Sequence, residues 1–435
     1  MGGTLMTIAL DRRRFLMGST ALLGATALSP AAALAQENRI RMLFWGGQAR
    51  ADRTYAVTDL YAKANPGTVF DGEFMAFSDY WPKLGTQVAG GNAPDILQMD
   101  YRYIVEYANR NAIAPLDDFV GKELDLGDFD ADQLEGGKVN GKLYGISLGA
   151  NSVALMVNKT AFEEAGIAIP GPEFSYADLP ALAEEWNSKN KRPGMKVWSD
   201  YSGGEPGLDN WLRSKGKGLY GADGKPLFDE NDLVEWFQMW ADLRAAGVTV
   251  SPDDQALDAN DAIENTMITL GKAATTYANS NQLIAFQALS KDEYTMIHYP
   301  RYKPGAGGGH YRKPSMFWSL GATSQKLSDG AKFINFFISD PEGTKALGVE
   351  RGIPCKASTR ANIEPTLDAQ SQIALNFVSN LGDLLGPLPP SPPANAGEIN
   401  KALKTKSQEV AFGGQSPQDA GPAFFKEVTE ILSRT

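Results

Sequence analysis

Residues 145–149 read Gly-Ile-Ser-Leu-Gly and match the G-x-S-x-G spelling of a hydrolase nucleophile elbow. Such an elbow needs a strand, a sharp turn and then a helix, so that the serine is raised above the sheet. The residues that follow Ser147 are apolar and β-branched instead, and no helix start is found before Lys159. The triad also requires an acid and then a histidine downstream, and His298 and His310 are the two histidines of the chain. We therefore expect no catalytic role for Ser147.

The sequence predicts neither a metal site nor a cofactor. Both histidines lie far from any cluster of cysteine or carboxylate residues, which a zinc site would require. Segment 303–309 is rich in glycine but lacks the G-x-x-x-x-G-K-[ST] spelling of a phosphate-binding loop. His310 occupies the last glycine position of G-x-G-x-x-G, so a dinucleotide fingerprint is absent as well. We interpret this segment as a loop.

Length and charge narrow the class of protein. A chain of 435 residues exceeds one ordinary hydrophobic core and predicts two or three packed units. The formal net charge of −11 argues against a general affinity for nucleic acid or anionic membranes, because both require a basic face. Cys355 is the single cysteine, so an intramolecular disulfide is excluded and packing must supply the stability.

The first 35 residues are expected to be an export signal. Segment 11–17, Asp-Arg-Arg-Arg-Phe-Leu-Met, is similar to a twin-arginine (Tat) pattern, although Ser or Thr would be preferred first and Lys last. The apolar run 16–28 is too short to span a bilayer stably, and residues 33–35 spell an A-x-A cleavage site. Because no cysteine stands at that site, no lipid anchor is predicted, and we expect a soluble periplasmic protein.

Beyond this signal, strand patterns alternate with helix patterns. Strands are predicted over 39–45, 69–74, 94–100, 152–157, 271–277 and 294–299, and helices over 51–65, 80–89, 159–165, 176–187 and 231–246. Helices dominate after Ser328, and the proline cluster 387–393 predicts an extended surface segment. The alternation indicates an α/β fold, in which ligands bind at the carboxyl ends of the strands.

A set of short motifs links the chain to a known family. They are Ala93-Pro-Asp-Ile-Leu-Gln-Met-Asp100, Ile113-Ala-Pro-Leu-Asp-Asp-Phe119, Gly141-Lys-Leu-Tyr-Gly145 leading to Val157-Asn-Lys159, Phe162-Glu-Glu-Ala-Gly166, Gly271-Lys-Ala-Ala and Glu350-Arg-Gly-Ile-Pro354. In this order and spacing, the chain resembles the extracellular solute-binding proteins of ABC sugar importers. That group includes the maltose- and multiple-sugar-binding proteins.

The resemblance implies a two-lobe periplasmic-binding-protein fold. Each lobe would be a mainly parallel sheet flanked by helices, with a sugar held between the lobes. Lobe 1 is expected to contain residues 36–149 and 282–320, and lobe 2 residues 151–279 and 324–435. Hinge crossings are expected at 147–151, 278–282 and 319–324, and the glycines at the first of them can absorb dihedral changes.

Sugar recognition needs flat aromatic faces and planar polar groups, which restricts the candidate site residues. Four tryptophans occur at strand ends, loops or crossings, and core packing is the alternative for each: Trp45, Trp198, Trp211 and Trp318. Trp198 and Trp211 flank the loop 199–204. Three further tryptophans at mid-helix positions, 186, 236 and 240, are predicted to lie in the core.

The polar candidates are Asp100, Asn151, Asn279 and Arg351. The first three stand at strand ends or crossings. Asn151 falls where the maltose-binding branch has an acidic ligand-binding residue, so the hydrogen-bonding pattern and the sugar stay open. Arg351 belongs to the closing motif of the family, and the alternative for it is a surface charge or an ion pair between helices.

The resemblance implies a monomeric, non-catalytic protein that binds a mono- or oligosaccharide and delivers it to the transmembrane subunits of an ABC permease. One alternative is an exported glycosidase or lyase, which would need a pair of carboxylates such as Asp100 and Asp200. Another is a periplasmic sensor without transport. The sequence identifies neither the sugar nor its length or charge.

Overall fold

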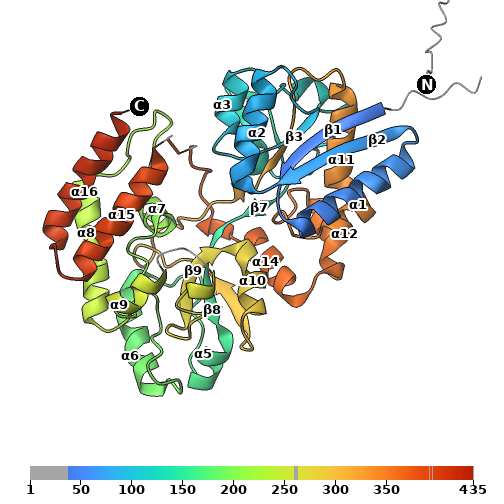
Figure 1. Ribbon diagram of the computed structural model, residues 1–435. Coiled ribbons are helices and arrows are strands. Elements are labelled where there is room, and N and C mark those ends of the chain that lie inside the picture. The colour runs from blue at the N-terminus through green and yellow to red at the C-terminus, as the bar shows by residue number, and fades with distance from the viewer. Residues whose placement is uncertain (1–37, 259–262, 391, 394, 435) are drawn as a thin grey trace, which may run out of the picture.

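The computed structural model describes residues 38–434 apart from 259–262, 391 and 394, so the expected export signal lies outside the described residues. The described chain forms two α/β lobes, which lie at the upper right and the lower left of Figure 1. We call the lobe that contains the first strand lobe 1, and the other lobe 2. This architecture confirms the expected two-lobe α/β fold.

Lobe 1 is built on a five-stranded sheet whose strands come from distant parts of the chain. In spatial order they are β2 (Thr68–Met75), β1 (Asn38–Trp45), β3 (Ile96–Met99), β12 (Phe317–Leu320) and β6 (Ile146–Ser147). The first three run parallel, and β12 is antiparallel to both of its neighbours. Every residue of β3 is buried, as expected for a central strand that is covered on both faces.

Helices follow the strands of lobe 1 as predicted. α1 (Gln48–Ala64) follows β1, and α2 (Phe77–Ala89) follows β2. α1 stops at Ala64 because Pro66 cannot continue a helix. α1 packs against α11 (Leu327–Ser339) and α12 (Pro341–Leu347), which lie beside it in Figure 1. The shorter helices of this lobe are α3 (Ile104–Asn109), α4 (Ala131–Glu135) and α13 (Ala357–Ile363).

The sheet of lobe 2 differs from the expected parallel arrangement. Its strands are β10 (Tyr294–Ile297), β8 (Val153–Asn158) and β9 (Thr275–Asn279), and both outer strands are antiparallel to β8. β9, α10 (Leu283–Ala288) and β10 form a β–α–β unit, and β8 is inserted between its two parallel strands. Each hydrogen-bonded pair is therefore antiparallel, and the prediction of a mainly parallel sheet is wrong for this lobe.

Helices make up most of the secondary structure of lobe 2. They include α5 (Lys159–Ala165), α6 (Leu179–Lys189), α7 (Glu205–Ser214), α8 (Glu230–Ala245), α15 (Ala396–Ala411) and α16 (Pro417–Leu432). α8 begins at a capping box, in which the Asp229 side chain accepts from the backbone N–H of Asp232. The indoles of Trp186, Trp236 and Trp240 are fully buried, which confirms the prediction that they lie in the core.

Strand pairing divides the chain between the lobes differently from the expectation. Residues 294–297 form β10 and pair with β8, so they belong to lobe 2 rather than lobe 1. Residues 327–347 form α11 and α12 and pack against α1, so they belong to lobe 1 rather than lobe 2. The local patterns of these segments were predicted well, but pairing between distant segments decides which lobe each one joins.

The first expected crossing agrees with the structure. β6 ends in lobe 1 at Ser147, β8 begins in lobe 2 at Val153, and β7 (Ala150–Asn151) lies between the lobes in Figure 1. β7 pairs antiparallel with β11 (Lys313–Pro314), which lies on the second crossing.

The other two crossings lie elsewhere than expected. Residues 278–282 end β9 and lead into α10, so the chain stays in lobe 2 there and crosses at β11 instead. Residues 319–324 stay in lobe 1, because Ser319 belongs to β12 and the Ser324 hydroxyl donates to Asp95 at 2.6 Å. The chain leaves lobe 1 after α13 and reaches α14 (Ala369–Ser379), which packs against β10.

Candidate ligand-binding site

A cavity of about 340 Å³ lies in lobe 2, between the loop 200–206, the end of β9 and helix α15. Its wall also includes α9 (Pro252–Gln255) and part of α10. Three tyrosines line it, namely Tyr201, Tyr277 and Tyr299, together with five side-chain amides, namely Gln255, Asn279, Gln282, Asn400 and Gln408. Aromatic rings beside planar amides match the requirements of a carbohydrate, which offers apolar C–H faces and paired hydroxyls.

Tyr201 forms the accessible part of this aromatic wall. Its ring is stacked on the ring of Tyr277 at 4.2 Å between centroids and 4° between planes. Tyr277 is buried, whereas Tyr201 is partly exposed. A Cβ added at Gly204 would lie 2.3 Å from the Tyr201 ring, and one at Gly207 2.7 Å from it, so glycine is needed at both positions for this ring to pack.

Two of the predicted tryptophans support aromatic clusters rather than line the cavity. The indole of Trp198 is fully buried, and its N–H donates to the Tyr277 hydroxyl at 3.0 Å, which fixes the ring beneath Tyr201. Trp45 is 7% exposed and meets Phe77 and Tyr80 edge-on, with centroids 5.3 and 5.1 Å away.

The other two predicted tryptophans lie in the cores. Trp318 is fully buried and meets Phe44 and Phe337 edge-on, at 6.1 and 5.6 Å between centroids. Trp211 is also fully buried, packs against Trp236 and lies beneath the Lys215 ammonium at 4.3 Å. Neither indole has a free face for a sugar, so both fit the alternative of core packing.

The polar candidates are distributed over three places. Asn279 is exposed and lines the cavity. Asp100 is 7% exposed, follows β3 in lobe 1 and accepts from the Arg102 backbone N–H at 2.9 Å. Asn151 is partly exposed on β7, where it pairs with Lys313 of the hinge.

Arg351 lies inside lobe 1. Its guanidinium donates to the Thr54 hydroxyl at 2.8 Å, contacts the Glu350 carboxylate at 3.4 Å and lies over the Phe337 ring. Burial lowers the pKa of Arg351 to about 9. Its carboxylate partner is the neighbouring residue of the same turn rather than a residue of another helix, and Arg351 does not line the cavity.

Glu205 is a site residue that the sequence did not indicate. It is the first residue of α7, it is partly buried, and it lines the cavity. Within the described chain its carboxylate has neither a hydrogen bond nor an ion pair. Burial and the nearby negative charge of Asp209 raise the pKa of Glu205 to about 7, although Lys313 and Arg102 oppose this rise. In the sequence, Gly-Gly-Glu-Pro is an ordinary helix start, which gives no sign of the cavity.

Lys313 brings a second charge without a partner to the lobe boundary. It lies on β11 of the hinge, and its ammonium has no ion pair among residues 38–434 as described. Burial lowers the pKa of Lys313, while the charges of Asp100 and Glu205 oppose that shift. Lobe 1, the hinge and lobe 2 thus each place a charged group at one boundary. Partly buried charges without partners are costly, so a ligand that bonds to them would be stabilised there.

Comparison with known proteins decides the family. The model for bacterial extracellular solute-binding proteins matches residues 56–370, which is most of the chain. The chain belongs to this family. A solved family 1 extracellular solute-binding protein from Alicyclobacillus acidocaldarius is 29% identical with a TM-score of 0.80, over 91% of this chain and 98% of that one.

More distant relatives share the fold or part of the sequence. A periplasmic oligogalacturonide-binding protein from Yersinia enterocolitica has a TM-score of 0.74 at 22% identity, over 91% of this solute-binding protein and 99% of that chain. A binding protein of Brucella abortus is 26% identical over 51% of this chain and 47% of its own length. The multiple sugar-binding protein of Streptococcus mutans is 23% identical over 42% and 43%. The chain therefore spans about half the length of the curated relatives it matches.

In this solute-binding protein Ser147 is a structural residue of the first crossing. Its buried hydroxyl donates to Gln133 Oε1 at 3.0 Å and lies 3.4 Å from the Cys355 sulfur. His310 lies elsewhere, between Ser152 and the backbone N–H of Tyr299. The described residues contain no cluster of His, Cys, Asp or Glu that could hold a metal ion, and none of their helices is long and apolar enough to cross a membrane.

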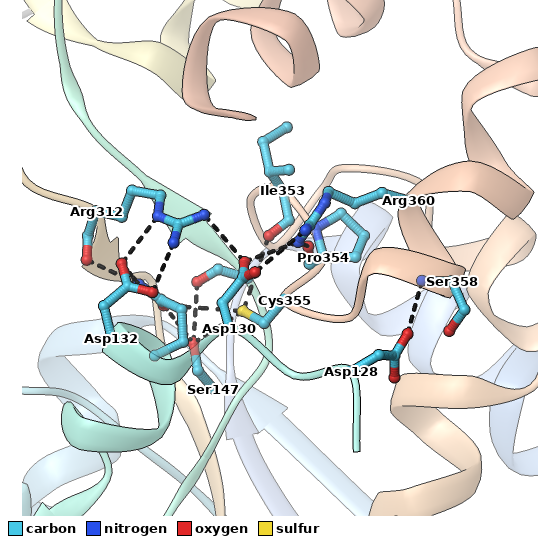
Figure 2. Close-up of polar contacts among 12 residues, drawn as sticks. Asp128, Asp130, Asp132, Ser147, Arg312, Ile353, Pro354, Cys355, Ser358 and Arg360 are labelled. Atoms are coloured by element: carbon cyan, nitrogen blue, oxygen red, sulfur yellow. Dashed lines mark hydrogen bonds and ion pairs between the residues drawn. The ribbon is translucent and has the colours of Figure 1, made fainter. Parts of the chain in front are cut away.

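An ion network ties the second crossing of this solute-binding protein to lobe 1. Figure 2 shows the Arg312 guanidinium between Asp132, bound at 2.8 Å through two nitrogens, and Asp130, bound at 3.1 Å. Arg360 of α13 approaches Asp130 from the other side at 2.7 Å. Gln133 joins the two crossings, because its amide nitrogen donates to the Arg312 carbonyl while its oxygen accepts from Ser147.

Proposed function

We propose that this chain is the substrate-binding component of an ABC importer, that it binds a mono- or oligosaccharide, and that it delivers this sugar to the transmembrane subunits of a permease. The observation that carries the proposal is the cavity in which the stacked, partly exposed Tyr201 ring stands beside five side-chain amides. Two similar proteins, a multiple sugar-binding protein and an oligogalacturonide-binding protein, support the same class of ligand.

Sugar hydroxyls both donate and accept hydrogen bonds, and this suits the groups of the cavity wall and of the nearby lobe boundary. The Glu205 carboxylate accepts only, the Lys313 ammonium donates only, and the amides do both. A saccharide could satisfy the first two without supplying a charge of its own. We propose Tyr201, Asn279 and Glu205 as ligand contacts in lobe 2, and Asp100, Asn151 and Lys313 as the groups that face them from lobe 1 and the hinge.

The proline-rich segment already bridges the two lobes. The Tyr101 hydroxyl of lobe 1 donates to the Pro389 carbonyl at 2.6 Å, and Arg213 of α7 contacts the Pro387 carbonyl. Such a contact between lobes would have to adjust when the lobes move about the crossings. We propose that the protein acts in the periplasm as a monomer, after export directed by its first 35 residues.

The alternative of a carbohydrate-cleaving enzyme finds no support in the pair Asp100 and Asp200. The Asp200 carboxylate is buried, pairs with Arg244 at 2.5 Å and accepts from the Ser202 hydroxyl at 2.6 Å. A carboxylate held in this way is not available as an acid or a nucleophile at a glycosidic bond. The proposal is therefore binding alone.

Tyr201→Ala tests the proposal. We expect this variant to lose about tenfold or more in affinity for the sugar that a thermal-shift panel identifies, because the aromatic face of the cavity is removed. Isothermal titration calorimetry with the intact chain measures the change. Tyr302→Ala is the control, since Tyr302 packs against Trp211 outside the cavity and should leave affinity unchanged. Failure of every neutral and acidic saccharide to raise the melting temperature would refute the proposal.

A further inference from the structure

The Asp, Glu, Lys and Arg side chains that line the cavity are mostly acidic. They are Asp200, Glu205, Asp258 and Lys404. The charge of Asp200 is compensated by Arg244, which pairs with it at 2.5 Å behind the cavity wall. Glu205, Asp258 and Lys404 remain in the wall, and because the pKa of Glu205 is raised to about 7, its carboxylate is mostly ionised only at basic pH.

Glu205 is the acid in this wall that lacks a partner. Its carboxylate has no hydrogen bond or ion pair in the described part of the chain. The cations that face it, Lys313 and Arg102, belong to the hinge and lobe 1 and do not line the cavity. Arg102 is exposed and paired with Asp100 at 3.3 Å, so it is only a weak counter-charge for Glu205.

A carboxylate without a partner distinguishes between two kinds of sugar. Hydroxyls of a neutral saccharide donate to it and form charge-assisted hydrogen bonds, which are stronger than neutral ones. A uronic acid would instead bring a second negative charge into a confined volume, where like charges repel strongly. A group that rejects one ligand in this way determines specificity as much as a group that attracts another.

We propose that Glu205 makes the cavity selective for neutral saccharides over uronic acids of the same length. This inference rests on the proposed sugar-binding function and names the substrate class of the same site. It separates this chain from its structural neighbour from Yersinia enterocolitica, which is described as an oligogalacturonide-binding protein.

The test compares matched pairs of saccharides that differ only in oxidation at C6, for example the disaccharides of galactose and of galacturonic acid. Pairs of the gluco, galacto and manno series are first screened by thermal shift at pH 8, and calorimetry follows on the series that binds. We expect the wild type to prefer the neutral member by about tenfold or more, and Glu205→Gln to reduce this preference to about threefold or less.

Asp223→Asn is the matched control, because it removes one carboxylate from an exposed turn of lobe 2, where Asp223 pairs with Lys225. It should keep the preference of the wild type. A wild type that prefers the uronic acid, or a Glu205→Gln variant with the same ratio as the wild type, overturns the inference while sugar binding stands. If no series binds at all, the proposed function itself fails.

Discussion

His310 is a buried histidine at the start of the second crossing. Its Nε2 accepts from the Tyr299 backbone N–H at 3.1 Å, and its Nδ1 lies 3.4 Å from the Ser152 hydroxyl. Burial, together with His298 and Arg213, lowers its pKa to about 3 from a usual 6.5. Between about pH 3 and pH 6.5, His310 therefore binds a proton in the unfolded chain but not in the folded chain. The contribution of neutral His310 is fully present above about pH 6.5 and is lost as the pH falls towards 3.

We therefore predict that acid destabilises the wild type more than it destabilises His310→Gln. The difference in their free energies of unfolding should change by up to about 1.4 kcal/mol per pH unit below pH 6.5. Urea unfolding at pH 7 and pH 5 measures it. The comparison with a variant is needed because the raised pKa values of Glu205 and Asp209 act in the opposite sense over much of this range. Equal pH dependence in both proteins would contradict the prediction.

At the residue scale, the sequence predicted which segment lies near the site, but it did not predict which side chains line the cavity. Trp198 and Trp211 flank the loop 199–204, but the aromatic side chain of that loop that lines the cavity is Tyr201. An indole at a strand end looks the same in sequence whether it faces a core or a cleft. Its burial depends on partners such as Phe337 for Trp318, which come from distant segments. The absence of a partner for Glu205 is likewise a property of the folded chain.

At the element scale, the ion pairs of Asp130 are expected to stabilise the second crossing against lobe 1. Asp130→Asn removes the negative charge that Arg312 and Arg360 share. The side chain of Asp130 is 15% exposed, so solvent screens the loss only in part. We predict a decrease of about 1–3 kcal/mol in the free energy of unfolding.

Urea denaturation of Asp130→Asn checks this value. Glu106→Gln is the control, because it breaks the exposed pair between Glu106 and Arg110 on the surface of lobe 1. This control should change stability by no more than about 0.5 kcal/mol. If both variants lose the same small amount, the network does not hold the crossing.

Elements with a strong local pattern were predictable, and their assembly was not. The helix expected over 159–165 is α5 with the same bounds, because Asn158 caps its start and Gly166 adopts the left-handed conformation at its end. The strand expected over 294–299 exists as β10, yet its partner is β8, more than a hundred residues earlier. Periodicity describes a segment and carries no information about that partner. For this reason two of the three crossings were misplaced.

At the scale of the whole molecule, the three crossings predict a closing motion. Because the chain passes between the lobes through short segments such as β7 and β11, we expect ligand to draw the lobes together. Small-angle scattering should show a smaller radius of gyration with the matched sugar. At a hundredfold excess over its dissociation constant, the ligand should add about 2.7 kcal/mol of stability and raise the melting temperature by a few degrees. A higher melting temperature at an unchanged radius would show that ligand binds without hinge closure.

The interleaving of segments between lobes also determines when each lobe can fold during synthesis. Lobe 1 lacks β12 and α11 until more than three quarters of the chain has been made. Lobe 2 starts later, at β8, and also finishes later, because α16 buries Phe424, Val428 and Ile431 against a core that includes α8. A nascent chain must therefore keep apolar strands exposed until its last helix arrives. Contacts between such distant segments slow folding and leave partly folded chains open to aggregation, so this protein is expected to depend on protection while it is being made.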